Sequence, residues 1–403
     1  MAYFARWAAT AIALPAVTLS QAAFAQSDEV SGIRAGSFTI SPSVSVTTSF
    51  ENNVFLEDVN EEESFRVIIG PEVSIQSDWN RHAVRLDAGV QANFFSNDSD
   101  DNFVGYFVDL SGELDVQRGI RITGGVGYTA DSEARGAVDT PGNVAEPIDV
   151  QTISADLGAI VQFNFIRIQP FAGITSQDFD DAPIIGGGIS NQDDRDRIEL
   201  EAGLEVGYEL RTGFEAFIRG SYNITDYDAA VDDTGVNRDS DGWRILGGVE
   251  VELTRLVEGR VGLGYSQRDF DDPALASTGG FAADVGVIWT PTRRLTIELA
   301  AARDIAETTI AGASSSTELR VLLGANYSVL RNLDARGAFE YANAEFDGSG
   351  RTDNTYQFTV GADWDLTRQL TLSPQYRFET RDSNVAGSDY DNHIISLEAL
   401  YRF

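Results

Sequence analysis

Apolar and polar residues alternate along most of this sequence, in segments of 10 to 15 residues. Between residues 198 and 210, for example, Leu204 and Val206 share one set of alternate positions, and Glu205 belongs to the other set. Successive side chains of a strand point to opposite faces, so one face of each segment suits hydrocarbon and the other suits water. The same pattern fills residues 318–329 and 356–366. Strands of this length can cross the apolar band of a membrane, whereas a soluble sandwich uses shorter strands with a polar outer face.

Two kinds of connection separate these segments. The sequence has eight short connections that carry arginine and nine longer ones rich in Asp, Asn, Ser and Gly. Nine hairpins joined in this way predict an all-β fold, a transmembrane antiparallel up-and-down β-barrel of about 18 strands, with 16 as the alternative count. The short turns are expected in the periplasm and the long acidic loops outside the cell. The short connections are 78–81, 117–119, 164–167, 211–213, 254–259, 290–294, 330–332 and 367–369, and examples of the long ones are 51–63, 96–102, 130–148, 178–194, 226–241 and 381–391.

The first 25 residues have the layout of a secretory signal peptide. Arg6 precedes an apolar run from Ala8 to Leu19, and the small residues Ala23 and Ala25 form a cleavage site. We therefore expect a signal peptide over 1–25, a short periplasmic segment over 26–36 and an outer-membrane barrel over 37–403. The 26–36 segment is too short for a separate plug domain, but the loop 130–148 is long enough to fold inward and constrict the lumen.

Charge and cysteine content exclude some classes of protein. The formal net charge of the whole chain is −34, and loss of the signal peptide with its one arginine makes it one unit more negative. Such a surface repels nucleic acid, so nucleic acid is not an expected partner. The chain has no cysteine, so an exported protein of this length must be stabilised by its fold and not by disulfides.

The ends of the segments carry further membrane signals. Aromatic residues cluster near both the short and the long connections, as expected for two interfacial girdles. The chain ends with alternate apolar positions that close on Tyr401 and Phe403, a pattern similar to the signature that the barrel-insertion machinery recognises. Prolines inside four expected strands cannot donate a ladder hydrogen bond, so bulges or shifted strand ends are expected there. These prolines are Pro42, Pro71, Pro170 and Pro374.

Several segments resemble a large proteobacterial family labelled "putative β-barrel porins". The resemblance covers essentially the whole mature chain and implies an outer-membrane barrel. Some members of that family are encoded beside exopolysaccharide genes, which implies a role in polysaccharide passage. The matching segments are 51–55 (Glu-Asn-Asn-Val-Phe), 70–73 (Gly-Pro-Glu-Val), the two Gly-x-Gly-Tyr segments 125–128 and 262–265, and the turn 289–295.

The sequence offers little for catalysis. It has two histidines, and His393, close to Asp391, is the one placed near the outer rim, where barrel hydrolases hold a His–carboxylate pair. A solvent-exposed rim histidine is the simpler interpretation. No nucleophile elbow, phosphate-binding loop or Cys/His metal cluster is present in the sequence. We therefore predict no enzyme activity, no catalytic residue, no cofactor and no metal.

Four expected strands end in an acidic–aromatic–acidic triplet at the outer mouth. The aromatic faces could stack on sugar rings, and the acidic oxygens could hold divalent cations. The simpler interpretation is an aromatic anchor flanked by solvated charges at each hairpin end. The triplets are Asp178-Phe179-Asp180, Asp226-Tyr227-Asp228, Asp269-Phe270-Asp271 and Glu345-Phe346-Asp347.

Residues of both charges occupy the polar face of the segments and are expected to line the lumen. In porins such residues set ion selectivity, whereas cross-strand salt bridges that stiffen the wall are the structural alternative. The pore-lining candidates are Arg66, Arg85, Arg121, Arg219, Arg244, Arg320, Arg336, Arg377, Glu72, Asp87, Asp109, Glu113, Glu205, Glu250, Glu318, Glu340 and Asp363.

Together these features predict a porin-like passive channel for small solutes, with a weak preference for cations or neutral solutes because the acidic residues gather in the outer loops. An exopolysaccharide export barrel and a closed surface-binding structural barrel are the alternatives. The expected partners are outer-membrane lipid and lipopolysaccharide, the insertion machinery, and small solutes or polysaccharide. The sequence does not identify an oligomeric state.

Overall fold

The protein is described here by a computed structural model that covers residues 32–97, 99–133, 136, 138–141, 144–254 and 256–403. The expected signal peptide, residues 1–25, lies outside these described residues. No helix within the described ranges is long and apolar enough to span a membrane.

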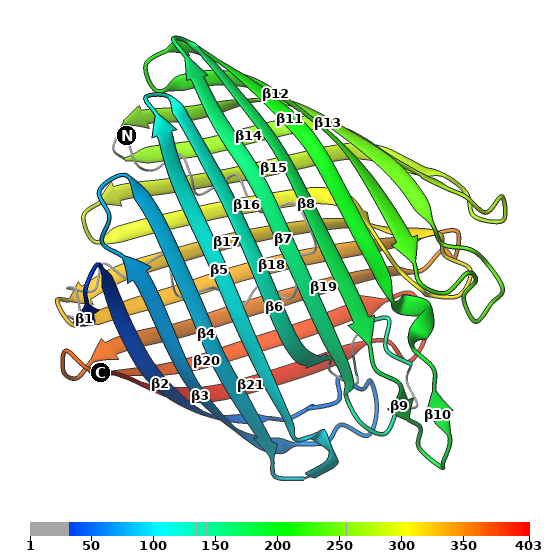
Figure 1. Cartoon of the computed structure of the whole chain (residues 1–403). Helices are drawn as coiled ribbons and strands as arrows, with labels where there is room; N and C mark the ends of the chain where they lie inside the picture. The colour runs from blue at the N-terminus through cyan, green and yellow to red at the C-terminus, as the bar shows by residue number, and fades with distance from the viewer. Residues whose placement is uncertain (1–31, 98, 134–135, 137, 142–143, 255) are drawn as a thin grey trace.

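Eighteen long strands form one closed antiparallel sheet (Figure 1). The last strand pairs with the first, from Ser43 opposite Arg402 to Glu51 opposite Ile394. Joining the two edges in this way pairs every barrel strand on both sides. The predicted all-β barrel of 18 strands is therefore confirmed. Its strands are β2 (Phe38–Glu51), β3 (Ser64–Ser77), β4 (His82–Phe95), β5 (Phe103–Gln117), β6 (Ile120–Glu133), β7 (Ile148–Phe163), β8 (Ile166–Phe179), β11 (Arg197–Arg211), β12 (Phe214–Tyr227), β13 (Ser240–Thr254), β14 (Val257–Phe270), β15 (Thr278–Thr292), β16 (Leu295–Ala306), β17 (Ser315–Leu330), β18 (Leu333–Asp347), β19 (Thr352–Asp365), β20 (Leu370–Ser383) and β21 (Tyr390–Arg402).

Within the part of the chain that the structure describes, three short strands and two 3-10 turns lie outside the 18 barrel strands. β1 (Ile33–Ala35) pairs with the start of β2. By its residue numbers it lies in the segment 26–36, which was expected to precede the barrel. β9 (Ala182–Pro183) and β10 (Ile189–Ser190) pair within the connection between β8 and β11. The 3-10 turns are Ser99–Asp101 and Asp193–Arg195.

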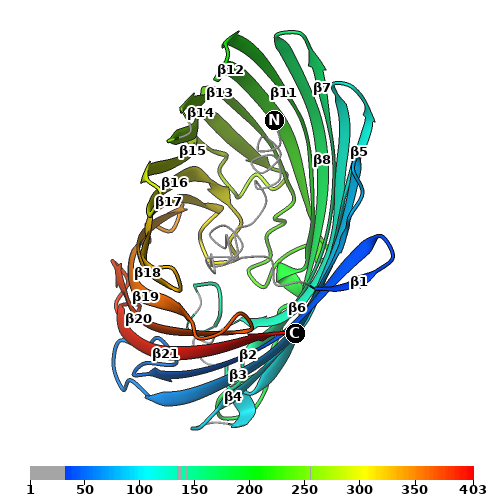
Figure 2. The same cartoon turned by 90° about the vertical axis from the view of Figure 1, so that its left-hand side faces the viewer.

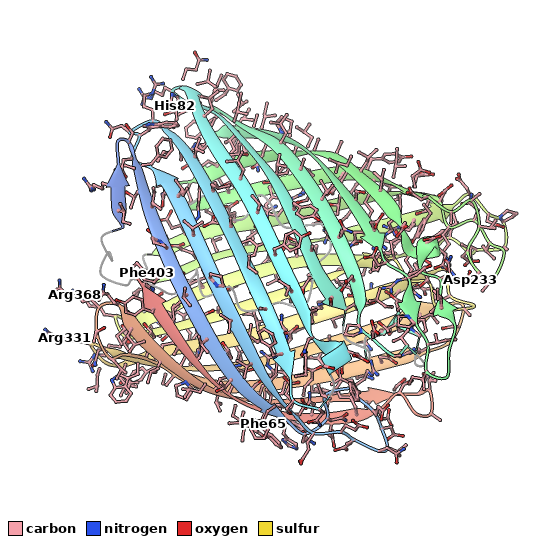
Figure 3. The ribbon with its side chains drawn as sticks, turned by 60° about the horizontal axis from the view of Figure 1, so that its bottom comes forward. Phe65, His82, Asp233, Arg331, Arg368 and Phe403 are labelled. Atoms are coloured by element: carbon pink, nitrogen blue, oxygen red, sulfur yellow. The ribbon has the colours of Figure 1, made fainter. Side chains whose placement is uncertain are left out.

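The two ends of the barrel differ, as the sequence predicts. The turn end carries eight connections of two to four residues, and the loop end carries nine connections that reach 17 residues at 180–196. One of the nine, 348–351, is as short as the turns. His82, Arg331, Arg368 and Phe403 lie at the turn end and Asp233 lies at the loop end (Figure 3).

The predicted alternation corresponds to the two faces of the wall. Val206 is 42% exposed on the outside, and its neighbour Glu205 is 3% exposed on the inside. Ile218 is 65% exposed and Phe217 is 3% exposed. Large apolar side chains are exposed in this way around the ring, which a protein surrounded by water avoids and a lipid-facing barrel requires.

Aromatic residues pair across neighbouring strands near both ends of the outer wall. Phe38 and Trp79 lie 5.5 Å apart at the turn end, measured between ring centroids. At the loop end, Tyr106 pairs with Tyr128, Trp243 with Tyr265, and Tyr341 with Tyr356, at 5.7, 5.7 and 5.1 Å. These pairs match the expected girdles.

The expectation of bulges or shifted strand ends at the four prolines is wrong. Pro71, Pro170 and Pro374 all lie within strands. At each of them the pairing with one of the two neighbouring strands skips two residue pairs and then continues in the same register. Pro42 lies where β2 meets the last residues of the chain, and its carbonyl accepts a hydrogen bond from Phe403 N at 3.1 Å. A local gap in one ladder therefore accommodates the missing donor without an extra residue. The register shifts within hairpins occur beside the short turns, for example between Glu209 and Arg211.

Candidate functional site

The inner wall carries ion pairs, some between different strands and some within one strand. Six of the predicted pore-lining arginines are paired with carboxylates of the same wall. Four of these pairs join different strands, which supports the expected stiffening role, and the other two, at Arg85 and Arg320, lie within one strand. The effect of these residues on selectivity stays a prediction. The pairs are Arg66–Glu51 at 4.0 Å, Arg85–Asp87 at 2.5 Å, Arg121–Glu113 at 3.1 Å, Arg244–Asp304 at 3.2 Å, Arg320–Glu318 at 3.0 Å and Arg336–Asp363 at 3.3 Å.

One part of this wall is much denser than the rest. Arg167, Glu205, Glu215, Glu250 and Arg260 form what we call the inner cluster, on strands β8 and β11–β14. Arg167 Nη2 lies 2.8 Å from Glu205, 2.6 Å from Glu215 and 3.1 Å from Glu250. Arg260 contacts Glu205 at 2.5 Å and Glu250 at 3.4 Å. Guanidinium groups shared among several carboxylates hold one another in a fixed geometry.

Aromatic rings packed on glycines support the inner cluster. The Arg260 guanidinium lies 3.8 Å from the centroid of the Phe217 ring. A Cβ atom on Gly248 would lie 2.6 Å from that ring, so only glycine leaves room for it. Phe171 repeats the arrangement over Gly203, and the Arg219 guanidinium lies 4.1 Å from the Phe171 ring centroid. Cation–π contacts therefore cover the apolar patches of an otherwise polar wall.

Connections of the loop end contact one another across the mouth of the barrel. We call the described residues of 134–147, 180–196, 228–239 and 307–314 the loop plug. The Thr308 hydroxyl donates to Asp139 Oδ1 at 2.7 Å. The connections that carry these two residues are separated by eight barrel strands on one side and ten on the other, so this contact crosses the lumen. In the view from the turn end, loop segments lie within the outline of the ring (Figure 2).

Arg238 is the central residue of the loop plug. Its guanidinium pairs with Asp232 at 2.7 Å and donates to the carbonyl oxygens of Thr308 at 2.7 Å and Ala313 at 3.1 Å. The side chains of Arg238 and Asp232 are each 3% exposed. A buried charge is tolerated only when it is paired and hydrogen-bonded, and here both conditions are met.

A small apolar core and a second buried arginine complete the plug. Val144, Ile148, Phe179 and Ala182 pack together with 0 to 6% exposure. Arg195 lies 4.0 Å from the centroid of the Phe179 ring and donates to both carboxylate oxygens of Glu133, at 2.9 and 3.0 Å. The connection within the predicted loop 130–148 spans 134–147, and its described residue Asp139 reaches inward to Thr308. Constriction of the lumen by this loop stays a prediction.

Carboxylates of the plug have shifted acidities. Burial raises the pKa of Asp196 to about 6, assisted by the nearby charges of Asp178, Asp193 and Asp228. Burial also raises the pKa of Asp139. For Asp232, burial acts in the same direction, but hydrogen bonds from Thr234, Val236 and Arg238 outweigh it and lower the pKa.

A cavity of about 430 Å³ lies at the loop ends of β5, β6 and β7, and one of about 320 Å³ lies inside the barrel. The inner cavity is bordered by strands β11–β17 and by Glu307, the first residue of a plug connection. Its wall includes the predicted residues Arg244, Glu318 and Arg320. It is therefore a chamber with many charged residues in its wall, next to the plug.

The acidic–aromatic–acidic triplets lie at the loop end, but most of their aromatic rings are covered. Phe179, Tyr227 and Phe346 are 5 to 7% exposed. Arg195 stacks on Phe179, and Arg351 lies 5.2 Å from the Phe346 ring centroid. Of the four aromatic residues in the triplets, Phe270 alone is not buried, so the sugar-stacking hypothesis has little support from this arrangement.

His393 lies on the outer wall in an aromatic setting. Its Nδ1 is 2.8 Å from the Tyr376 hydroxyl, and its ring stacks on Phe378 with 4.8 Å between centroids. A membrane-interface girdle accounts for this position better than a general base does. Within the described ranges, no group of three or more His, Cys, Asp or Glu residues is arranged to hold a metal ion.

Sequence reasoning missed Arg167, Arg260 and Arg268 as residues of the inner wall, and Glu307 as the first residue of a plug connection. Strand parity was sufficient to find two of them, because Leu263 and Tyr265 point outward and Arg260 and Arg268 therefore point inward. The last predicted residues lie at the end of β21, where the rings of Tyr401 and Phe403 are 4.9 Å apart and exposed. Their recognition by insertion machinery stays a prediction.

Comparisons with solved structures give distant neighbours. A mutant of the ferric enterobactin receptor PfeA from Pseudomonas aeruginosa matches with a TM-score of 0.48 and 10% identity, over 90% of this chain and 80% of that chain. The siderophore receptor PiuA from Acinetobacter baumannii gives 0.47 and 12%, over 92% and 82%. OccAB4 from the same organism gives 0.45 and 11%, over 90% and 98%. Similarity at this level indicates nothing about what this chain binds.

No curated protein matches the sequence. A family model described as "Putative beta-barrel porin 2" matches residues 28–403, which is nearly the whole chain. The match confirms the family resemblance drawn from the sequence motifs. The chain belongs to the family "Putative beta-barrel porin 2".

Proposed function

We propose that this protein is an outer-membrane channel for small solutes, exported by its signal peptide. The observation that carries the proposal is a closed ring of 18 strands with exposed apolar side chains outside and paired charges inside. Such a ring satisfies its backbone hydrogen bonds within a bilayer and presents a polar inner wall to water. The family description supports the same function.

The inner wall favours polar solutes of low net charge. Arginines and carboxylates pair with each other along the wall, so their opposite fields largely cancel at a distance of a few ångströms. The acidic residues of the loop end add a negative potential at the outer mouth, which attracts cations and repels anions. A weak cation preference is therefore expected.

The loop plug makes the resting channel narrow. We expect small, infrequent conductance steps from the wild-type protein in planar lipid bilayers, with cations more permeant than anions. The Arg238→Gln variant should conduct more, because it removes the central contacts of the plug. Clear anion selectivity in the conducting variant would contradict the proposed selectivity. If neither protein conducts, the barrel is a closed structural or surface-binding protein instead.

A further inference from the structure

A buried set of donors on the inner wall holds the carboxylate of Glu307. The Tyr227 hydroxyl donates to Glu307 Oε2 at 3.0 Å, and the Thr225 hydroxyl donates to Oε1 at 3.2 Å. Arg268 forms an ion pair with the same carboxylate. Thr225 is 1% exposed, and Tyr227 and Arg268 are each 7% exposed. Two buried hydroxyl donors and one buried guanidinium therefore surround a single carboxylate.

The site and its occupant belong to different parts of the molecule. Thr225, Tyr227 and Arg268 lie on β12 and β14, where strand pairing fixes them. Glu307 is the first residue after β16 and begins the plug connection 307–314. The next residue, Thr308, makes the contact with Asp139 that crosses the lumen. Release of Glu307 would therefore act directly on the loop plug.

The inner cavity of about 320 Å³ is bordered by both Arg268 and Glu307. This volume is at the lower end of the range for small-molecule sites, about 300–1,000 Å³, so it suits a solute of a few heavy atoms. A solute in the cavity is within reach of the donors that now hold Glu307.

The charges around the cavity indicate the class of solute. Its wall includes four arginines and six carboxylates, with Glu307 among the six. A solute carboxylate that replaces Glu307 leaves the charge at the donors unchanged. A positive group on the same solute would reduce the acidic excess of the wall. The arginines are Arg197, Arg244, Arg268 and Arg320, and the carboxylates are Glu199, Glu201, Asp284, Asp304, Glu307 and Glu318.

We propose that Thr225, Tyr227 and Arg268 form a binding site for the carboxylate of small zwitterionic solutes of the amino-acid type, and that Glu307 occupies this site as an internal competitor. The inference deepens the proposed channel function and rests on it for the role of the plug. Binding of a solute carboxylate displaces Glu307 and loosens the connection 307–314. The solute binds more tightly to the state in which Glu307 is displaced, and it therefore shifts the equilibrium towards the open mouth.

The test measures binding to the purified full-length protein in detergent by isothermal titration calorimetry. The probes are glycine, acetate and methylamine. Glu307→Ala should bind glycine at least about tenfold more tightly than wild type, because the internal competitor is gone. Asp233→Ala is the matched control, since it removes a plug carboxylate at the outer tip of the loop end, and it should bind like wild type (Figure 3). Glycine should bind Glu307→Ala more tightly than either acetate or methylamine.

A second change identifies the donors. Adding Arg268→Gln to Glu307→Ala should abolish the gain in glycine affinity. If that double variant does not fold, Tyr227→Phe takes the place of Arg268→Gln and should reduce the gain. Folding is checked by the shift in gel mobility on boiling. Equal glycine affinity in wild type and Glu307→Ala overturns the site, as does a gain that persists without Arg268. If glycine binds as expected but the protein never conducts, the proposed channel function is wrong and the carboxylate site stands. If the protein conducts but this binding pattern is absent, only the proposed carboxylate site is wrong.

Discussion

The connections at the loop end and those at the turn end join the same set of strands, but they do so in opposite ways. At the turn end, connections as short as two residues reverse the chain, with positive φ angles at Gly119, Asn164 and Gly213. At the loop end, long connections cross the lumen and bury charged residues such as Arg238. Local backbone geometry therefore determines the turn end, and long-range side-chain contacts determine the loop end. Changes that affect passage are expected at the loop end.

The largest effect is expected from Arg238→Gln. The change removes the ion pair to Asp232 and weakens the hydrogen bonds to two carbonyl oxygens of 307–314. Loss of one partner from a buried pair costs about 3–5 kcal/mol, enough to open the plug in most molecules. Conductance in planar bilayers should rise severalfold.

The matched control for Arg238→Gln is Arg81→Gln at the turn end. The side chain of Arg81 is 61% exposed, and its distance to the Asp115 carboxylate is 4.0 Å. An exposed pair of this kind contributes at most about 1 kcal/mol, so conductance should stay at the wild-type level. Equal conductance in both variants would show that Arg238 does not close the mouth.

The inner cluster offers a second contrast, this time within the wall. Arg260→Gln should lower the free energy of unfolding by about 3 kcal/mol, because Glu205 and Glu250 remain buried without that partner. Arg121→Gln removes a pair whose side chains are 32% and 30% exposed, and should cost within about 1 kcal/mol. Urea unfolding of both variants in detergent compares the two costs. A similar loss for both would mean that the density of the inner cluster adds no stability.

The sequence predicted the turn end better than the loop end, for a physical reason. Alternation and turn composition are local signals, so they located the strands and the eight turns. The contact between Thr308 and Asp139 joins residues 169 positions apart and leaves no periodic signal. The inner position of Arg260 follows from strand parity, but its burial depends on Phe217 from a strand two places away in the ring.

The acidity of Asp196 predicts that the plug depends on pH. Its pKa in the folded protein is about 6, above the ordinary value of 3.8, chiefly because of burial. The carboxyl of Asp196 therefore binds a proton more readily in the folded plug than in the unfolded loop. Protonation of Asp196 thus stabilises the folded plug at low pH, and this stabilisation is lost as the pH rises from about 4 to 6. Proteolysis of the loop end should be slower at pH 5 than at pH 7. Asp196→Asn should reduce this difference, and an unchanged difference would assign it to other groups.

The smallest effect is expected at a turn of the turn end. Gly213 has a φ of +76°, and a Cβ atom there would lie 2.5 Å from the carbonyl oxygen of Glu252. Gly213→Ala should therefore lower the free energy of unfolding by about 1–2 kcal/mol. Gly220→Ala is the control, because a Cβ there meets nothing within 4 Å. Both variants should conduct like wild type, since neither residue touches the loop plug, and a change in conductance from Gly213→Ala would show that the turn end also controls passage.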